Sequence, residues 1–178
     1  LKRLRINLFQ LGTNTGLHRT HSATNPHSSY EDLRYFRRHF ITPKAIRDTI
    51  SALVNRILEV RNDRIWGYTT AVASDGKQFP AWDQNLMAGS NPHYTIRGVM
   101  VYWHVEKNSV CIFSQVKNCN SSEIAAMIRG LLYHSTNMEI DTNYVDSAGQ
   151  SEVAFAVSHF LGIDLLPRLK RIKSEKLY

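Results

Sequence analysis

Hydrophobic residues in the second half of the chain alternate between two periods, and this alternation narrows the possible folds more than any other feature. Apolar, β-branched runs of strand length occur at 69–74, 98–105, 110–116, 140–145 and 164–167. Apolar residues at 121–134 and 153–161 instead recur at helical spacing, each between two of the later strands. The element order is therefore β-β-β-α-β-α-β, which predicts an α/β protein.

The connections between these elements determine how the strands pair. The polar turn at 106–109 is short enough to join two strands as an antiparallel hairpin, whereas the later strands follow crossover helices. This is the element order of the ribonuclease H-like fold, in which the first and fourth strands lie side by side at the sheet centre. We predict a mixed five-stranded sheet flanked by helices, with an N-terminal helical extension.

The first 64 residues form a separate helical, basic segment in this prediction. Helical spacing and the capping sequence Thr42-Pro43 predict a helix over 43–60, and a shorter helix is expected over 30–40. The stretch 12–29 is rich in Thr, Asn, His and Ser, and we expect it to be a loop or disordered. The predicted domain boundary separates residues 1–64 from a core domain at 65–178.

The net charge of +7 is distributed unevenly along the chain. Residues 1–64 carry 12 Lys and Arg against 5 Asp and Glu, residues 65–163 carry 5 against 8, and residues 164–178 carry 5 against 2. Basic flanks suit a protein that grips nucleic-acid phosphates, because such contacts supply most sequence-independent affinity for DNA. A solvated basic surface explains the same charges equally well. No stretch approaches the roughly 20 apolar residues of a membrane span, so we expect no membrane partner.

Two carboxylates occupy equivalent places in the predicted sheet. Asp75 directly follows the strand at 69–74, and Asp146 follows the strand at 140–145. If these strands are neighbours, the two carboxylates lie close together. Mg²⁺ is usually held by a few such hard oxygen ligands together with water and phosphate, so the pair could hold this ion. Alternatively, each aspartate ends a strand in an ordinary turn, since Asp-Gly and Asp-Ser are common turn dipeptides.

Five segments of the chain closely resemble the catalytic region of Tn-three family transposases, the DDE enzymes of replicative, cointegrate-forming bacterial transposons. They are WGYTTAVASDGKQF at 66–79, AWDQNLMA at 81–88, RGVMVYWHVEKNSVCIFSQVKNCNSSEIAAMIRGLLYH at 97–134, YVDSAGQSEVAFAVSHFLG at 144–162 and LLPRLKRIKSEKLY at 165–178. The stretches at 8–17 and 30–64 resemble the part just upstream in the same family. The resemblance thus covers nearly the whole chain.

The resemblance implies a catalytic triad of two aspartates and a glutamate that holds Mg²⁺, with Mn²⁺ able to substitute. Asp75 and Asp146 match the first two positions and would be the catalytic and metal-binding residues. In the family the glutamate lies on a helix well beyond the fifth strand. Residues 65–178 are therefore expected to be a ribonuclease H-like catalytic core that is truncated before the third acidic residue.

The family also implies a reaction and partners. The expected activity is Mg²⁺-dependent cleavage of DNA at transposon ends and strand transfer to target DNA, in the bacterial cytoplasm at the nucleoid. The DNA partners would be terminal inverted repeats and target DNA, and the intact enzyme would be a homodimer. The side chains expected to contact DNA are Lys77, Arg34, Arg37, Arg38, Arg168, Lys170 and Arg171. A solvated surface role remains open for these cations.

Two other functions stay open at this point. A ribonuclease H-type nuclease would use Asp75, Glu123 and Asp146, with Glu123 supplied by the start of the helix at 121–134. Glu123 also fits a variant capping box, with Asn120 as the N-cap and Glu123 at N3, which needs no metal. The remaining alternative is a non-catalytic DNA-binding module that retains only the fold.

Overall fold

The computed structural model of the protein describes residues 1–24, 28–82, 84–91 and 94–169. The chain forms two compact units, Leu1–Ile50 and Ser51–Tyr178. Helix α4 (Pro43–Val60) contributes to both units, and the predicted domain boundary after residue 64 stays a prediction. Among the described residues, no helix combines the length and apolar character that crossing a membrane requires.

The N-terminal unit is built from helices, as predicted. It contains α1 (Lys2–Thr13), α2 (Leu17–Thr24), α3 (Tyr30–Phe40) and the first part of α4. Leu33 of α3 is fully buried, and its carbonyl accepts a 3.2 Å hydrogen bond from the side-chain amide of Asn7 on α1. At the start of α4 the Thr42 hydroxyl accepts the backbone N–H of Ala45 at 3.1 Å, which confirms the predicted cap.

Helix α2 corrects the expectation that residues 12–29 lack regular structure. Its residues have modest helix propensity, but Leu17 and Thr20 are buried. The Thr20 hydroxyl also donates to the carbonyl of Gly16 at 3.0 Å. Tertiary burial of this kind overrides a weak local preference. Residues 25–27, at the end of the same stretch, lie outside the described residues.

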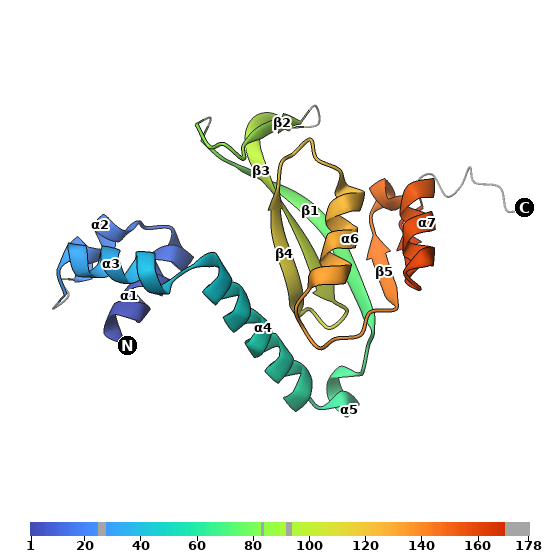
Figure 1. Ribbon diagram of the computed structural model, residues 1–178, viewed down its shortest axis with the longest axis horizontal. Helices are drawn as coiled ribbons and strands as arrows, with labels where there is room; N and C mark the ends of the chain where they lie inside the picture. The colour runs from blue at the N-terminus through green and yellow to red at the C-terminus, as the bar shows by residue number, and fades with distance from the viewer. Residues whose placement is uncertain (25–27, 83, 92–93, 170–178) are drawn as a thin grey trace, which may run out of the picture. The chain divides into compact units, whose positions relative to one another are not determined.

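The second unit contains the predicted mixed sheet (Figure 1). Its strands are β1 (Ala71–Pro80), β2 (Gly89–Asn91), β3 (Tyr94–Glu106), β4 (Cys111–Lys117), β5 (Thr142–Val145) and β6 (Asp164–Pro167). The order is β2-β3-β1-β5-β6, with β4 also paired to β3. Strands β1, β3 and β4 are antiparallel, whereas β5 pairs with β1 and β6 in parallel. The ribonuclease H-like arrangement is confirmed, and within the described residues the short strand β2 is an addition to the five predicted strands.

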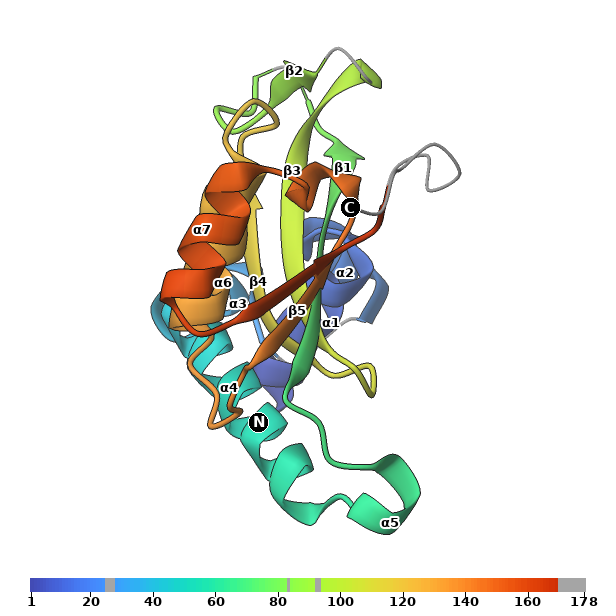
Figure 2. The ribbon, with the colours of Figure 1, turned by 90° about the vertical axis from the view of Figure 1, so that its right-hand side faces the viewer.

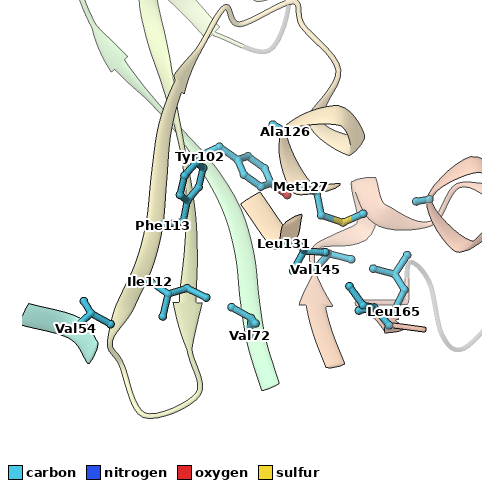
Figure 3. Close-up of a cluster of buried hydrophobic side chains, with 12 residues drawn as sticks. Val54, Val72, Tyr102, Ile112, Phe113, Ala126, Met127, Leu131, Val145 and Leu165 are labelled. Carbon is cyan, nitrogen blue, oxygen red and sulfur yellow. The ribbon is translucent and has the colours of Figure 1, made fainter. Parts of the chain in front are cut away.

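Two helices cover one face of this sheet. Helices α6 (Glu123–Tyr133) and α7 (Glu152–Phe160) lie on the same side of it in both views (Figures 1 and 2). The short helices α5 (Asp63–Trp66) and η1 (Ser147–Gly149) are connectors. The core forms under α6 and α7, where Val72, Tyr102 and Val145 of the sheet meet Met127 and Leu131 of α6 (Figure 3).

A buried ion pair attaches the segment after α4 to the end of β3. The guanidinium of Arg61, just after α4, donates to the carboxylate of Glu106 at 2.8 Å, and the two side chains are 9% and 0% exposed. Asn108, in the turn between β3 and β4, donates to both oxygens of Glu106, from its backbone N–H at 3.0 Å and its side chain at 3.1 Å. A buried carboxylate is tolerated only when it is paired and hydrogen-bonded in this way.

His104 on β3 is a second buried ionisable group. Its ring is fully buried between Tyr102 and Phe113, and its Nε2 lies 3.0 Å from the carbonyl oxygen of Met127 on α6. Gly130 of α6 lies directly against the ring, so a larger side chain there would clash with His104. Burial lowers the pKa of His104 to about 4, outweighing the bond to Met127.

This depressed pKa predicts a loss of stability in mild acid. The unfolded chain takes up the proton near pH 6.5 and the folded chain only near pH 4, so stability from neutral His104 is present above 6.5 and lost as the pH falls toward 4. At about 1.36 kcal/mol per pKa unit, the loss is about 3 kcal/mol. Urea unfolding of the wild type and of His104→Leu between pH 6.5 and pH 4 measures the free energy of unfolding at each pH. The free energy should fall more steeply with falling pH in the wild type than in His104→Leu. The exposed variant His159→Gln should follow the wild type, and equal slopes for wild type and His104→Leu would contradict the prediction.

Candidate active site

Asp75 lies inside strand β1 and not directly after a strand, which corrects the sequence-based expectation. Strand β1 keeps pairing with β3 from Val72 to Pro80, and Asp75 lies opposite Trp103. The Asp-Gly pair makes no turn here because β3 is long enough to pair with both residues. The Asp75 carboxylate accepts the backbone N–H of Gly76 at 2.7 Å and is exposed.

Asp146 is brought to Asp75 by the parallel pairing of β1 with β5. The last residue pair of that ladder is Ser74 with Val145, so Asp75 and Asp146 are the next residue on each strand. Both are exposed where β5 ends and β1 continues. Asp75 is therefore at the end of the β1–β5 ladder, although it is not at the end of its strand.

The phenol of Tyr102 on β3 is affected by the charges of three carboxylates. Burial raises the pKa of the Tyr102 phenol well above its usual range, and the negative charges of Glu123, Asp146 and Asp75 raise it further, in that order. The phenol therefore stays protonated near neutral pH and can only donate or accept hydrogen bonds as a neutral group. The structure thus places Glu123 in the same electrostatic environment as the two aspartates.

A small notch lies between these groups at the edge of the core. Its volume is about 10 Å³, and the residues lining it are Tyr102, Glu123, Ile124, Met127, Val145, Asp146 and Gly149. This is about the room that one water molecule requires. Gly149 packs so closely against Val145 that a side chain there would clash, which keeps the η1 turn close to the end of β5.

The capping role predicted for Glu123 is wrong. Helix α6 begins after Ser122, whose hydroxyl accepts the backbone N–H of Ala125 at 3.3 Å. Glu123 is therefore at N1, while Asn120 is part of a preceding turn in which its N–H donates to the Asn118 side chain at 2.9 Å. Among the described residues, the Glu123 carboxylate takes part in no hydrogen bond or ion pair, and its place in the first turn of α6 puts its negative charge near the positive end of the helix dipole.

Two of the predicted DNA-contact residues lie beside the aspartates. Lys77 is two residues beyond Asp75 on the same face of β1, is exposed, and has its Nζ 5.9 Å from the centre of the Phe79 ring. Arg168 is exposed and follows β6, where its N–H donates to the carbonyl of Val145 at 2.9 Å. Arg168 therefore lies next to Asp146 along the sheet edge.

The other predicted contacts are not brought to this site by the described structure. Arg34, Arg37 and Arg38 are exposed on α3 in the N-terminal unit, and Arg34 pairs with Glu31 at 3.7 Å. Lys170 and Arg171 lie outside the described residues. A role in DNA binding stays a prediction for all five.

The donor set at the end of the β1–β5 ladder fits Mg²⁺. It consists of exposed carboxylate oxygens, the hard ligands that this ion prefers, and leaves room for the water and phosphate oxygens that usually complete its shell. Within the described ranges, no group of three or more His, Cys, Asp or Glu residues is close enough to form a full protein cage. An open site with two carboxylates is the arrangement expected when the substrate supplies further ligands.

The sheet order, with β1 between β3 and β5, defines a ribonuclease H-like domain. The family model described as the Tn3 transposase DDE domain matches residues 1–178, and the chain belongs to this family. The family predicted from the sequence is therefore confirmed.

Transposases of several bacterial transposons are similar to the chain. The transposase for transposon Tn1546 of Enterococcus faecium is 28% identical over 172 residues, which cover 96% of this chain and 17% of that protein. The transposase for transposon Tn501 of Pseudomonas aeruginosa is 28% identical over 157 residues, covering 87% and 16%. The chain thus spans about one sixth of the length of these relatives.

One solved structure that the chain matches is the catalytic domain of Mos1 mariner transposase. It is 13% identical, with a TM-score of 0.38, and the match covers 71% of this chain and 60% of that chain.

Proposed function

We propose that the chain is the catalytic part of a DNA transposase that cuts DNA at transposon ends and transfers the cut strand to target DNA. The observation that carries the proposal is the placement of Asp75 and Asp146 at adjacent positions on neighbouring strands in a chain of the Tn3 transposase DDE domain family. A ribonuclease H-like sheet offers such an open carboxylate pair to a phosphodiester held at its edge.

Asp75 and Asp146 would hold Mg²⁺, or Mn²⁺ in its place, through their exposed oxygens. An ion held there would supply charge stabilisation for an in-line displacement at phosphorus. Lys77 and Arg168 lie beside the two aspartates and would bind phosphates that flank the scissile bond. The remaining predicted cations, Arg34, Arg37, Arg38, Lys170 and Arg171, would contribute salt-dependent affinity for the DNA backbone.

The proposed partners follow from the relatives, which are transposases of bacterial transposons. The substrates would be the terminal inverted repeats and the target DNA, and the protein would act in the bacterial cytoplasm at the nucleoid. Joining two transposon ends in one event requires two active sites, so the intact protein would work at least as a homodimer.

A test of this function uses the intact protein with Mg²⁺ and two substrates. The first is duplex DNA that carries the transposon end with flanking sequence, together with a target plasmid, and the second is an RNA–DNA hybrid of the same sequence. We expect cleavage at the transposon end and a joined product with the plasmid, and no cleavage of the hybrid.

A ribonuclease H-type nuclease is the second candidate function. It is favoured by one observation, that Glu123 and Asp146 line the same notch. Cleavage of the RNA strand of the hybrid, without cleavage of the transposon-end DNA, would contradict the transposase proposal and support this alternative.

A further inference from the structure

Tyr102 lines the small notch at the proposed active site and is largely buried. The side chain is 4% exposed, and its ring points from β3 toward α6 (Figure 3). The ring packs against His104 at 5.5 Å between centroids, and its edge lies 3.0 Å from where a side chain at Gly76 would begin. No described residue forms a hydrogen bond with the hydroxyl, which leaves it available to a water molecule in the notch.

The notch beside Tyr102 can hold a hydrogen-bond partner for its hydroxyl. It has the volume of about one water molecule, and the residues lining it that carry polar side chains are Tyr102, Glu123 and Asp146. A buried water needs two to four polar partners. Here the ionised carboxylates can only accept hydrogen bonds, and the phenol can donate one.

These roles are complementary around one bridging water molecule. A water in the notch would accept the O–H of Tyr102 and donate one proton to Glu123 and the other to Asp146. The Tyr102 hydroxyl and the Glu123 carboxylate, neither of which has a hydrogen bond to any described residue, would then both have a partner.

We propose that Tyr102 and Glu123 hold one water molecule against Asp146 and thereby position the Asp146 carboxylate for the divalent cation. The inference rests on the proposed function, which makes Asp146 a metal ligand. Tyr102 and Glu123 are positioning residues, because they act through the water and the Asp146 carboxylate. Partners of this kind fix the orientation of a ligand, and removing one typically weakens metal binding by about 10- to 100-fold.

The decisive variant is Tyr102→Phe, which removes the hydroxyl and keeps the ring and the net charge. Mn²⁺ affinity is measured by electron paramagnetic resonance, and thermal unfolding of the same samples checks the fold. We expect Mn²⁺ binding to weaken by about tenfold or more with no loss of thermal stability. A purely structural tyrosine would show unchanged affinity, and that result would overturn the proposal.

Glu123→Ala provides a second test with a matched control. Glu152 is also the first residue of a helix that follows a serine cap, since the Ser151 hydroxyl accepts the N–H of Ala154 at 3.1 Å. Glu123→Ala should weaken Mn²⁺ binding and Glu152→Ala should not. Because Tyr102 and Glu123 share one water, adding Tyr102→Phe to Glu123→Ala should cause little further loss. Fully additive effects would contradict the shared water.

Asp146→Asn separates failure of this inference from failure of the proposed function. If Asp146→Asn abolishes Mn²⁺ binding while Tyr102→Phe leaves it intact, Asp146 is a metal ligand but the proposed positioning by a water molecule is wrong. If Asp146→Asn also binds Mn²⁺ with wild-type affinity, Asp146 is not a metal ligand. The proposed function and the positioning role of Tyr102 and Glu123 are then both wrong.

Discussion

Replacing Asp75 or Asp146 with asparagine should lower the rate of DNA cleavage by the intact protein by about 10³-fold or more. Asparagine keeps the shape of the side chain and removes the charge that binds the cation. A bound metal ion contributes several kcal/mol of charge stabilisation to the transition state, and each 1.36 kcal/mol is about a factor of ten in rate. Single-turnover cleavage of transposon-end DNA in Mg²⁺ measures the effect.

Asp164→Asn is the matched control for these two variants. Asp164 is an exposed aspartate of the same parallel strands, but it begins β6 and pairs with Thr142, at the opposite end from Val145 and Pro167. It should therefore retain the wild-type cleavage rate. Wild-type cleavage by Asp75→Asn or Asp146→Asn, or an equal loss in Asp164→Asn, would remove the basis for assigning the site.

Arg61→Ala should lower the free energy of unfolding by about 3–5 kcal/mol, the range observed when one partner of a buried ion pair is removed. The variant leaves the Glu106 carboxylate, whose side chain is 0% exposed, without its guanidinium partner. The hydrogen bonds from Asn108 remain and satisfy the carboxylate only in part. Urea unfolding at neutral pH, followed by circular dichroism, measures the loss.

The matched control is Arg56→Ala, which breaks an ion pair of similar length on the surface of α4. Arg56 and Glu59 are 3.0 Å apart, with side chains 71% and 58% exposed. Exposed pairs of this kind contribute less than about 1 kcal/mol. If the two arginine variants lose the same free energy, burial of the Arg61–Glu106 pair is not the source of its effect.

Local patterns were sufficient to predict most of the elements in the second unit. Alternating and helical hydrophobic periods located the strands and helices because each element has one side that packs into the core, as Val72 and Val145 do. Gly162, predicted to end the last helix, has φ of +70° just after α7. Glycine tolerates this left-handed conformation, which explains why the helix stops there.

The environment of the aspartates could be predicted only in part. The fold order correctly placed the strand of Asp75 beside the strand of Asp146. The length of β1 was missed because an Asp-Gly pair is a strong local turn signal, whereas the pairing that overrides it comes from β3, more than twenty residues away in sequence. Long-range pairing of this kind leaves no trace in the local pattern.

Tyr102 was not recognised as part of the candidate site for the same reason. In the sequence it is one apolar residue of an alternating strand. Its relevance depends on the register that pairs it with Gly76, the residue after Asp75, and on the position of α6. The sequence predicts a capping role for Glu123 because Asn120 and Ser122 are both good N-cap residues, and only the structure shows that Ser122 is used.

The most direct measurement of the central claim is anomalous diffraction from crystals of the protein grown with Mn²⁺. The peak reports the metal position without reference to activity. The account predicts a peak coordinated by the carboxylates of both Asp75 and Asp146 at the end of the β1–β5 ladder. Mn²⁺ bound at other residues, with both of these carboxylates uncoordinated, would contradict it.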